Sequence, residues 1–361
     1  MLDRALDRRT LLRLGLAGAA GALREHLVAR RARAAEPPPP PRDPRERHLG
    51  NLRQLTFGGQ NAEAYFDRSG EWLVFQSTRP PFGCDQIFTM RADGTEVRLV
   101  STGTGRTTCA YFFPDGTRLL YASTHLAAPA CPPPPDRSRG YAWPLYDYDL
   151  FTCAVDGSDL RRIVGHPGYD AEGAVAPDGR RIVFTSHRNG DLDLYLCDPD
   201  GQNLTRLTDQ PGYDGGPFFA WDGRQIVWRG WHPTDPQELD EYRRLLGQGL
   251  VRPHRAELFV MDADGTGGRQ VTRNGAANWA PFLHPDGERI VFSSNLHDPG
   301  RFDFALYLVR RDGTGLERLT WAESFAAFPM FSRDGRRLVF CSSRGARVPR
   351  EYNVFVADWT E

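Results

Sequence analysis

The sequence contains no lysine, so arginine supplies all 45 of its basic residues. It has no apolar run of the length that a membrane-spanning helix needs. Its formal net charge is −1, which provides no overall positive field of the kind typical of nucleic-acid-binding proteins. These absences argue against a helical membrane protein and against a nucleic-acid partner.

Several motifs of catalysis are also missing. No G-x-S-x-G nucleophile elbow occurs, which excludes an attached peptidase of the α/β-hydrolase type. There is no G-x-G-x-x-G after a strand and no phosphate loop. The six cysteines form no C-x-x-C pair and no zinc-ligand spacing. We therefore expect no cofactor, although a divalent metal stays open as an alternative.

The cysteines divide by their surroundings. Cys153, Cys197 and Cys341 alternate into strand-like runs and are interpreted as buried apolar residues. Cys84 and Cys131, with Cys109, are predicted to lie in loops. A disulfide between two of these three is expected in an oxidising compartment, and the sequence does not say which two pair.

The basic charge is concentrated at the start of the chain. Residues 1–34 hold eight Arg and three acidic residues, and the stretch from Asp7 to Arg13 resembles a twin-arginine export motif. We interpret 1–34 as a signal segment and 35–48 as a proline-rich spacer before a folded body over 49–361. This predicts a periplasmic or secreted protein. The alternative is a basic tail on a cytoplasmic protein.

A repeat decides the predicted fold. The chain is rich in glycine (37) and proline (28), and one unit of roughly 45 residues recurs. All six copies have a first hairpin turn, and the first five also have a second one. Four short strands per unit are typical of a β-propeller blade. The first turn of each copy contains one of six glycines: Gly70, Gly116, Gly179, Gly223, Gly287 and Gly335.

The last copy of the repeat is completed by a strand near the start of the folded body. The sixth copy stops after its third strand at 353–358, and the missing fourth strand matches residues 52–56, L-R-Q-L-T. We predict an all-β, six-bladed propeller of four-stranded antiparallel blades, with the last blade closed by the N-terminal strand. An open solenoid is the alternative, and it leaves an unpaired terminal strand.

The strings P-D-G-x-R-I-V-F-x-S and D-x-D-G-x-x-L-x-R-L-T resemble the repeats of TolB-type proteins, the WD40-like propellers of the bacterial periplasm. The resemblance runs from Leu49 to the C-terminus. It implies a TolB-like propeller, here without the α/β domain that precedes the propeller in TolB. From it we expect a monomeric, non-enzymatic binding scaffold for a protein, peptide or glycan, acting in envelope transport or assembly.

The binding surface is predicted on the face that carries the longest loops. These loops follow the second strand of blades 2 and 4, at 125–146 and 231–255, and residues 236–246 have helical apolar spacing. The residues expected on this face share a polar or aromatic character and a position near the channel mouth or in a long loop: Glu63, Asp170, Glu172, Asp214, Asn278, Trp143, Trp231 and Tyr242.

Histidines motivate a second hypothesis. Four of them follow the second strand of different blades: His125, His187, His232 and His297. Imidazoles and carboxylates that converge on a propeller axis are suitable ligands for a divalent cation. The alternative function is therefore a metal-dependent lyase or hydrolase, similar to oligogalacturonate lyase, whose repeats are related.

Overall fold

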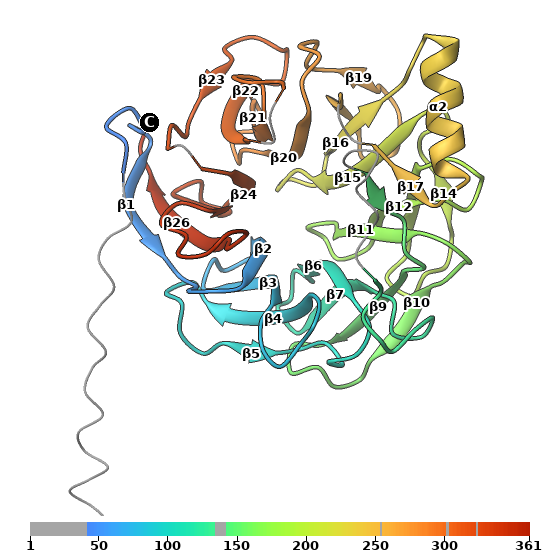
Figure 1. The fold of residues 1–361 in the computed structure, drawn as a ribbon, viewed down its shortest axis with the longest axis horizontal. Helices are drawn as coiled ribbons and strands as arrows, with labels where there is room; N and C mark the ends of the chain where they lie inside the picture. Colours follow the sequence, from blue (N-terminus) through green and yellow to red (C-terminus); the bar gives the residue numbers. More distant parts are fainter. Residues whose placement is uncertain (1–41, 134–141, 253–254, 301–302, 323) are drawn as a thin grey trace, which may run out of the picture. The chain divides into compact units, whose positions relative to one another are not determined.

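The computed structural model describes residues 42–361 except 134–141, 253–254, 301–302 and 323. The predicted signal segment 1–34 lies outside the described residues. Within the described part, six four-stranded antiparallel sheets surround a common centre (Figure 1). The predicted six-bladed β-propeller is confirmed.

The first five blades follow chain order, with their first strand innermost. Blade 1 contains β2 (Gln60–Phe66), β3 (Trp72–Thr78), β4 (Gln86–Arg91) and β5 (Arg98–Leu99). Blade 2 contains β6 (Thr107–Phe112), β7 (Arg118–Ser123), β9 (Asp149–Ala154) and β10 (Arg161–Val164). Blade 3 contains β11 (Asp170–Val175), β12 (Ile182–Ser186), β13 (Asp193–Cys197) and β14 (Thr205–Arg206). Blade 4 contains β15 (Tyr213–Phe219), β16 (Gln225–Trp231), β18 (Glu257–Asp262) and β19 (Arg269–Gln270). Blade 5 contains β20 (Asn278–Leu283), β21 (Arg289–Ser294), β22 (Ala305–Arg310) and β23 (Glu317–Arg318).

Blade 6 is assembled from both ends of the described chain. It contains β24 (Ala326–Phe331), β25 (Arg337–Ser342) and β26 (Asn353–Trp359), and β1 (Leu49–Gln54) pairs with β26 as its outer strand. The N-terminal strand thus removes an open sheet edge, as predicted.

Each blade also holds the next one through its backbone. The amide of the first or second residue of each innermost strand donates to a carbonyl just before the third strand of the preceding blade, as Thr107 does to Asp85 at 3.0 Å. The same bond closes the ring between blades 6 and 1, where Asn61 donates to Tyr352 at 2.9 Å.

One aromatic pair recurs in the core of every blade. A ring in the second strand faces a ring in the third strand at cross-strand partner positions, with centroids 5.3–6.1 Å apart. Such pairs stabilise antiparallel sheets. The six pairs are Phe75–Phe88, Tyr121–Phe151, Phe184–Tyr195, Trp228–Phe259, Phe292–Tyr307 and Phe340–Phe355.

The contacts of the ring begin before Leu49. Glu46 is buried and forms a bidentate ion pair with Arg344, with N···O distances of 2.8 and 2.9 Å. His48 stacks on Trp359 with ring centroids 4.8 Å apart. The C-terminal part of the predicted spacer 35–48 therefore packs on blade 6.

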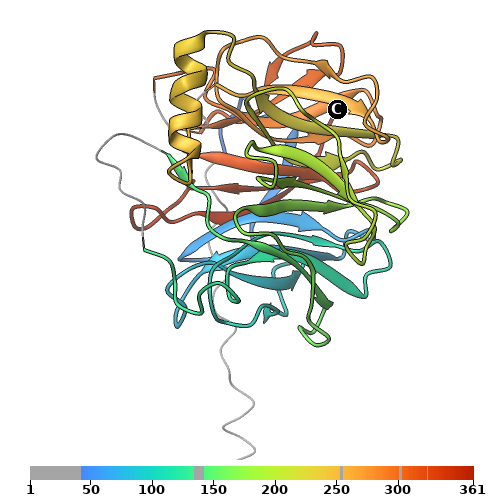
Figure 2. The same ribbon diagram turned by 90° about the vertical axis from the view of Figure 1, so that its right-hand side faces the viewer.

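The loops of blades 2 and 4 carry the remaining elements. The predicted helix is confirmed as α2 (Pro236–Leu246), whose first turn is capped by the Asp235 carboxylate, an acceptor for the Gln237 amide at 2.7 Å. In Figure 2, which shows the ring edge-on, α2 lies on one of its faces. No helix of the described residues is long and apolar enough to cross a membrane.

Candidate functional site: a central cavity on the loop face

Every innermost strand contains a β-bulge at the same place. The pairing register between first and second strands shifts once in each blade, and one residue at each shift has a left-handed φ between 46° and 60°. A side chain in this conformation is uncommon and costs on the order of 1 kcal/mol. The six bulge residues are Glu63, Cys109, Glu172, Gly216, Ala280 and Phe328.

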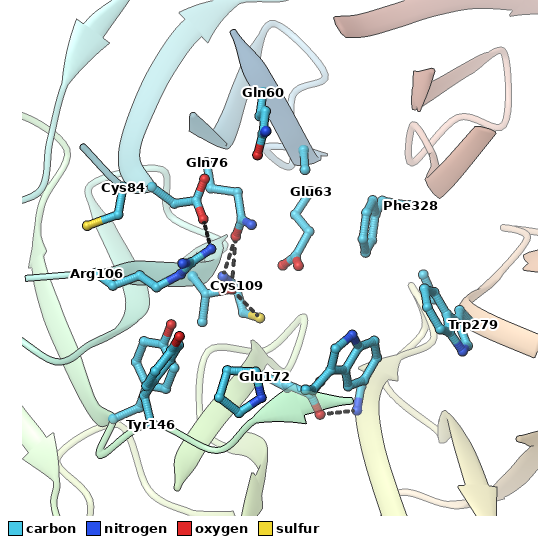
Figure 3. Close-up of a pocket in the computed structure, with 18 of the residues that line it drawn as sticks. Gln60, Glu63, Gln76, Cys84, Arg106, Cys109, Tyr146, Glu172, Trp279 and Phe328 are labelled. Carbon is cyan, nitrogen blue, oxygen red and sulfur yellow. Dashed lines mark hydrogen bonds and ion pairs between the residues drawn. The ribbon is translucent and has the colours of Figure 1, made fainter. Parts of the chain in front are cut away.

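All six bulge residues line one central cavity of about 920 Å³. The bulges therefore aim one residue of every blade at the common centre (Figure 3). Blades 1, 2 and 3 contribute a carboxylate, a thiol and a second carboxylate, whereas blades 5 and 6 contribute a methyl group and a phenyl ring. The cavity consequently has a polar side and an apolar side.

On the polar side, Glu172 is fully engaged. It forms an ion pair with Arg229 of the next blade and accepts hydrogen bonds from the Thr185 hydroxyl at 2.9 Å and the Gly216 amide at 2.8 Å. Burial alone would lower the pKa of Arg229, but the charge of Glu172 raises it above the ordinary range. Arg229 is therefore a permanent cation held by this carboxylate.

The glycine at the bulge of blade 4 makes room for this ion pair. A Cβ on Gly216 would lie 2.5 Å from Arg229 Nη1, and the residue has a φ of 60°. Glycine meets both demands because it has no Cβ. The guanidinium group of Arg229 in turn lies over the Trp143 ring, 5.2 Å from its centroid.

Glu63 occupies a different environment. Its carboxylate points into the open middle of the cavity, between Cys109 and Phe328 (Figure 3). Burial raises its pKa to about 7, and the charge of Glu172 acts in the same direction, against smaller opposite effects of Cys109 and Arg229. Glu63 thus changes its protonation state near neutral pH.

Cys109 carries a protonated thiol. Burial raises the pKa of this thiol well above its usual value, and the carboxylates of Glu63 and Glu172 raise it further. Its backbone amide donates to Gln76 Oε1 of blade 1 at 3.2 Å, which fixes the bulge. Because the thiolate is the reactive form, Cys109 is not poised as a nucleophile.

The apolar side consists of a continuous series of rings, which we call the aromatic arc. Successive centroids along it lie 5.0, 4.4, 5.8 and 5.1 Å apart. All of these rings line the cavity. The arc runs from the loop of blade 2 through blades 5 and 6: Trp143, Trp279, Phe304, Phe325 and Tyr352.

The two long loops meet above blade 3. Strand β8 (Trp143–Pro144) from blade 2 pairs with β17 (Leu250–Val251) from blade 4, and we call these paired strands the roof. Tyr242 of α2 packs with Val251 and Trp143 in one apolar cluster beneath the helix. A disulfide between Cys84 and Cys131 joins the loops of blades 1 and 2 at the cavity. The prediction of a disulfide among the loop cysteines is thereby confirmed.

One of those three cysteines was wrongly placed by the sequence. Cys109 lies within β6 rather than in a loop, because the bulge interrupts the alternation that marks a strand. It is a free thiol, as are the buried Cys153, Cys197 and Cys341.

The predicted loop-face residues divide into two groups. Glu63, Glu172 and Trp143 line the cavity. The other five are held by contacts of their own: Asp170 binds Arg188, Asp214 accepts from Trp228, Asn278 donates to Ala256, and Trp231 packs on Tyr242.

Three of the four histidines contact a side chain of their own blade. Nδ1 of His125 lies 2.8 Å from the Ser123 hydroxyl, and Nδ1 of His297 lies 3.2 Å from the Tyr307 hydroxyl. Nε2 of His232 lies 3.1 Å from Asp214, and burial lowers the pKa of His187. None of the four lines the cavity. Within residues 42–361, apart from the gaps named above, no group of three or more His, Cys, Asp or Glu side chains is arranged to hold a metal ion.

Sequence reasoning missed two parts of the site. Arg229 stands where other copies of the repeat have Thr185 or Ser293, and this departure was a visible signal. The aromatic arc has no such signal, because Trp279 and Phe304 read as core residues of a strand and a loop.

The fold and the site define a six-bladed β-propeller with a roofed central cavity. This fold is similar to that of solved TolB structures. A putative TolB from Agrobacterium tumefaciens is 18% identical with a TM-score of 0.57, over 86% of this chain and 97% of that one. TolB from Acinetobacter baumannii is 14% identical with a TM-score of 0.53, over 84% of this chain and 64% of that one.

A lyase has a similar fold. Oligogalacturonate lyase in complex with manganese is 14% identical with a TM-score of 0.50, over 87% of this chain and 99% of that one. A comparison with protein-family models finds no match, and neither does a comparison with the curated proteins. At these identities the likeness concerns the fold alone.

Proposed function

We propose that this protein is an exported, non-enzymatic binding scaffold that takes a segment of a protein, peptide or glycan into its central cavity. The observation that carries this proposal is the convergence of all six bulge residues on one cavity of about 920 Å³. Cavities of roughly 300–1,000 Å³ that combine apolar walls with a few placed polar groups are typical ligand sites.

The strained backbone supports this proposal. Five non-glycine residues adopt a left-handed φ at the bulges that line the cavity, although each costs free energy of folding. The ring needs the bulge of blade 1 for its shape but does not need a carboxylate at Glu63. Aromatic walls beside hydrogen-bonding groups suit sugar rings and peptide side chains alike.

Export is part of the proposal. The basic segment 1–34 with its paired arginines supports it, as does the Cys84–Cys131 disulfide, since disulfides persist in oxidising compartments. We propose a monomer in the periplasm or outside the cell, acting in envelope transport or assembly.

The binding experiment compares a blocked cavity with an unblocked one. Ala62 lines the cavity one residue before the bulge, and blade 5 has Trp279 at the equivalent position, so Ala62→Trp introduces a ring that this fold accommodates elsewhere. Gln202→Phe, in an exposed turn that does not line the cavity, is the matched control. Both variants and the wild-type protein are tested on arrays of oligosaccharides and of peptides, with circular dichroism as the check of folding.

We expect ligands of the wild-type protein to bind Gln202→Phe equally and Ala62→Trp at least tenfold more weakly. Equal binding by the folded Ala62→Trp variant, or no saturable binding to any member of the arrays, would contradict the proposal.

The second candidate function is a lyase or hydrolase. The observation that favours it is Glu63, a cavity carboxylate with a pKa of about 7, since acid–base catalysis uses a group that titrates near the working pH. Oligogalacturonides incubated with and without manganese test it. Cleavage that Glu63→Gln abolishes would favour the enzyme.

A further inference from the structure

The charged groups that line the cavity are unevenly matched. Three are acidic and three are arginines: Glu63, Asp85, Glu172, Arg106, Arg229 and Arg350. Arg229 pairs with Glu172, and Arg106 pairs with Asp85 at 2.5 Å. Arg350 is exposed at the cavity mouth. Among the described residues, Glu63 is therefore the carboxylate of the cavity that has no cationic partner.

The surroundings of Glu63 are aromatic. Phe328 of blade 6 is its neighbour in the ring of bulges, and Figure 3 shows the phenyl ring facing the carboxylate with Trp279 beyond it. Phe328 packs with Trp279 and Phe304, so it connects Glu63 to the aromatic arc. Tyr65 of blade 1 also lines the cavity at this point.

The same cavity already holds one cation in an arrangement of this kind. The guanidinium group of Arg229 lies between the Glu172 carboxylate and the face of Trp143. A cation between an anion and an aromatic ring gains from both the charge and the quadrupole of the ring. Glu63 and the rings beside it repeat this arrangement, and no arginine of the described chain fills it.

We propose that the cavity binds an organic ammonium group, with its charge against the Glu63 carboxylate and its carbon substituents against Phe328 and the aromatic arc. This inference rests on the proposed binding function and specifies the chemistry of the ligand. A free amino terminus, a lysine side chain and an amino sugar all carry such a group, and a quaternary ammonium carries it without N–H donors.

Because Glu63 titrates near neutral pH, the affinity for an ammonium ligand should depend on pH. A cation stabilises the ionised carboxylate, so it binds the deprotonated form, which predominates above about pH 7. Two acidic groups, Glu172 of blade 3 and Asp85 of blade 1, oppose the ionisation of Glu63. Cys109 of blade 2 and Arg229 of blade 4 favour it. Affinity for an ammonium ligand should therefore rise between pH 6 and pH 8.

Isothermal titration calorimetry with matched probes tests the inference. Choline and its neutral isostere 3,3-dimethylbutan-1-ol have the same shape and differ in charge, and n-butylammonium adds N–H donors. We expect the wild-type protein at pH 8 to bind at least one of the two cations at least tenfold more tightly than the alcohol. Glu63→Gln should lose at least tenfold in cation affinity and little for the alcohol.

Glu71→Gln is the control, because Glu71 is exposed and does not line the cavity. Equal affinity for a cation and the alcohol, an unchanged cation affinity in Glu63→Gln, or no saturable binding of either cation to the wild-type protein would overturn the inference. Suppose that one of these results is found, but ligands from the oligosaccharide and peptide arrays still bind the wild-type protein and bind Ala62→Trp more weakly. The proposed binding function then stands, and only the specificity for an ammonium group fails.

Discussion

Arg229 of blade 4 and Glu172 of blade 3 form an ion pair that joins neighbouring blades at the wall of the central cavity. Both side chains are about nine-tenths buried, with exposed fractions of 7% and 10%. This pair is a structural bond of the ring and a charged part of the candidate site at once.

Removing one member of this pair should destabilise the fold. Arg229→Met leaves the Glu172 carboxylate buried without its cation, and we expect the free energy of unfolding to fall by about 3 kcal/mol. In the double variant with Glu172→Gln the losses should be less than additive, by at least about 1 kcal/mol. Urea unfolding of the four proteins measures this, and strictly additive losses would show that the pair is not coupled.

The closing strand should be essential to the whole ring. Deletion of residues 49–58 removes β1 and the residues that follow it, and with them the buried Leu49 and Leu55, each of which contributes about 2 kcal/mol by burial. It also exposes the edge of β26. We expect a loss of at least about 4 kcal/mol and a fall of the melting temperature by several degrees. A chain that begins at Arg42 serves as the reference, and equal melting temperatures would refute the closure.

The disulfide should leave a simple chemical signature. The unfolded but unreduced protein should react with a thiol reagent at four cysteines, and the reduced protein at all six. Cys131→Ser should lower the free energy of unfolding by about 3–4 kcal/mol, because the bond closes a segment with a sequence separation of 47. The effect should disappear when both proteins are compared in reductant.

Glu63 should make stability depend on pH. Its pKa is raised from 4.5 to about 7 in the fold, so the folded state binds a proton more tightly than the unfolded chain. This contribution to stability is present below about pH 4.5 and is lost as the pH rises towards 7. The wild-type protein loses this contribution between about pH 5 and pH 8, and Glu63→Gln has none to lose. The melting temperature of Glu63→Gln minus that of the wild-type protein should therefore increase over this range. A constant difference would contradict the raised pKa.

The predicted signal segment has a direct test. Without residues 1–34 the protein should stay in the cytoplasm and keep its melting temperature in the purified state. Cell fractionation followed by immunoblotting measures the location. Export of the shortened chain to the periplasm would contradict the signal hypothesis.

The repeat made the fold predictable because each blade is specified locally. Alternating apolar residues and a first turn with glycine recur in all six units, and a second Asp-Gly turn recurs in five of them, so every blade can be recognised by comparison with the others. Even the closure was visible, since residues 52–56 match the outer strands of other blades. The helix at 236–246 was likewise encoded by local spacing.

The site was only partly predictable. Glu63 and Glu172 were expected on the loop face, but so were Asp170 and Asp214, which the structure uses in contacts within their blades. Asp170 and Glu172 lie two residues apart on β11, and the register shift that includes Glu172 turns this side chain towards the cavity while Asp170 binds Arg188.

By itself the sequence determined the blade and the number of blades, because these depend on patterns within a few dozen residues. It also determined how the ring closes, because residues 52–56 match the outer strand that the last copy of the repeat lacks. Only the tertiary structure decided what the ring encloses. The cavity brings together Glu63, Cys109 and Phe328 from blades 1, 2 and 6, pairs Arg229 with Glu172, and pairs Cys84 with Cys131. These residues are far apart in the chain, and the closed ring makes them neighbours.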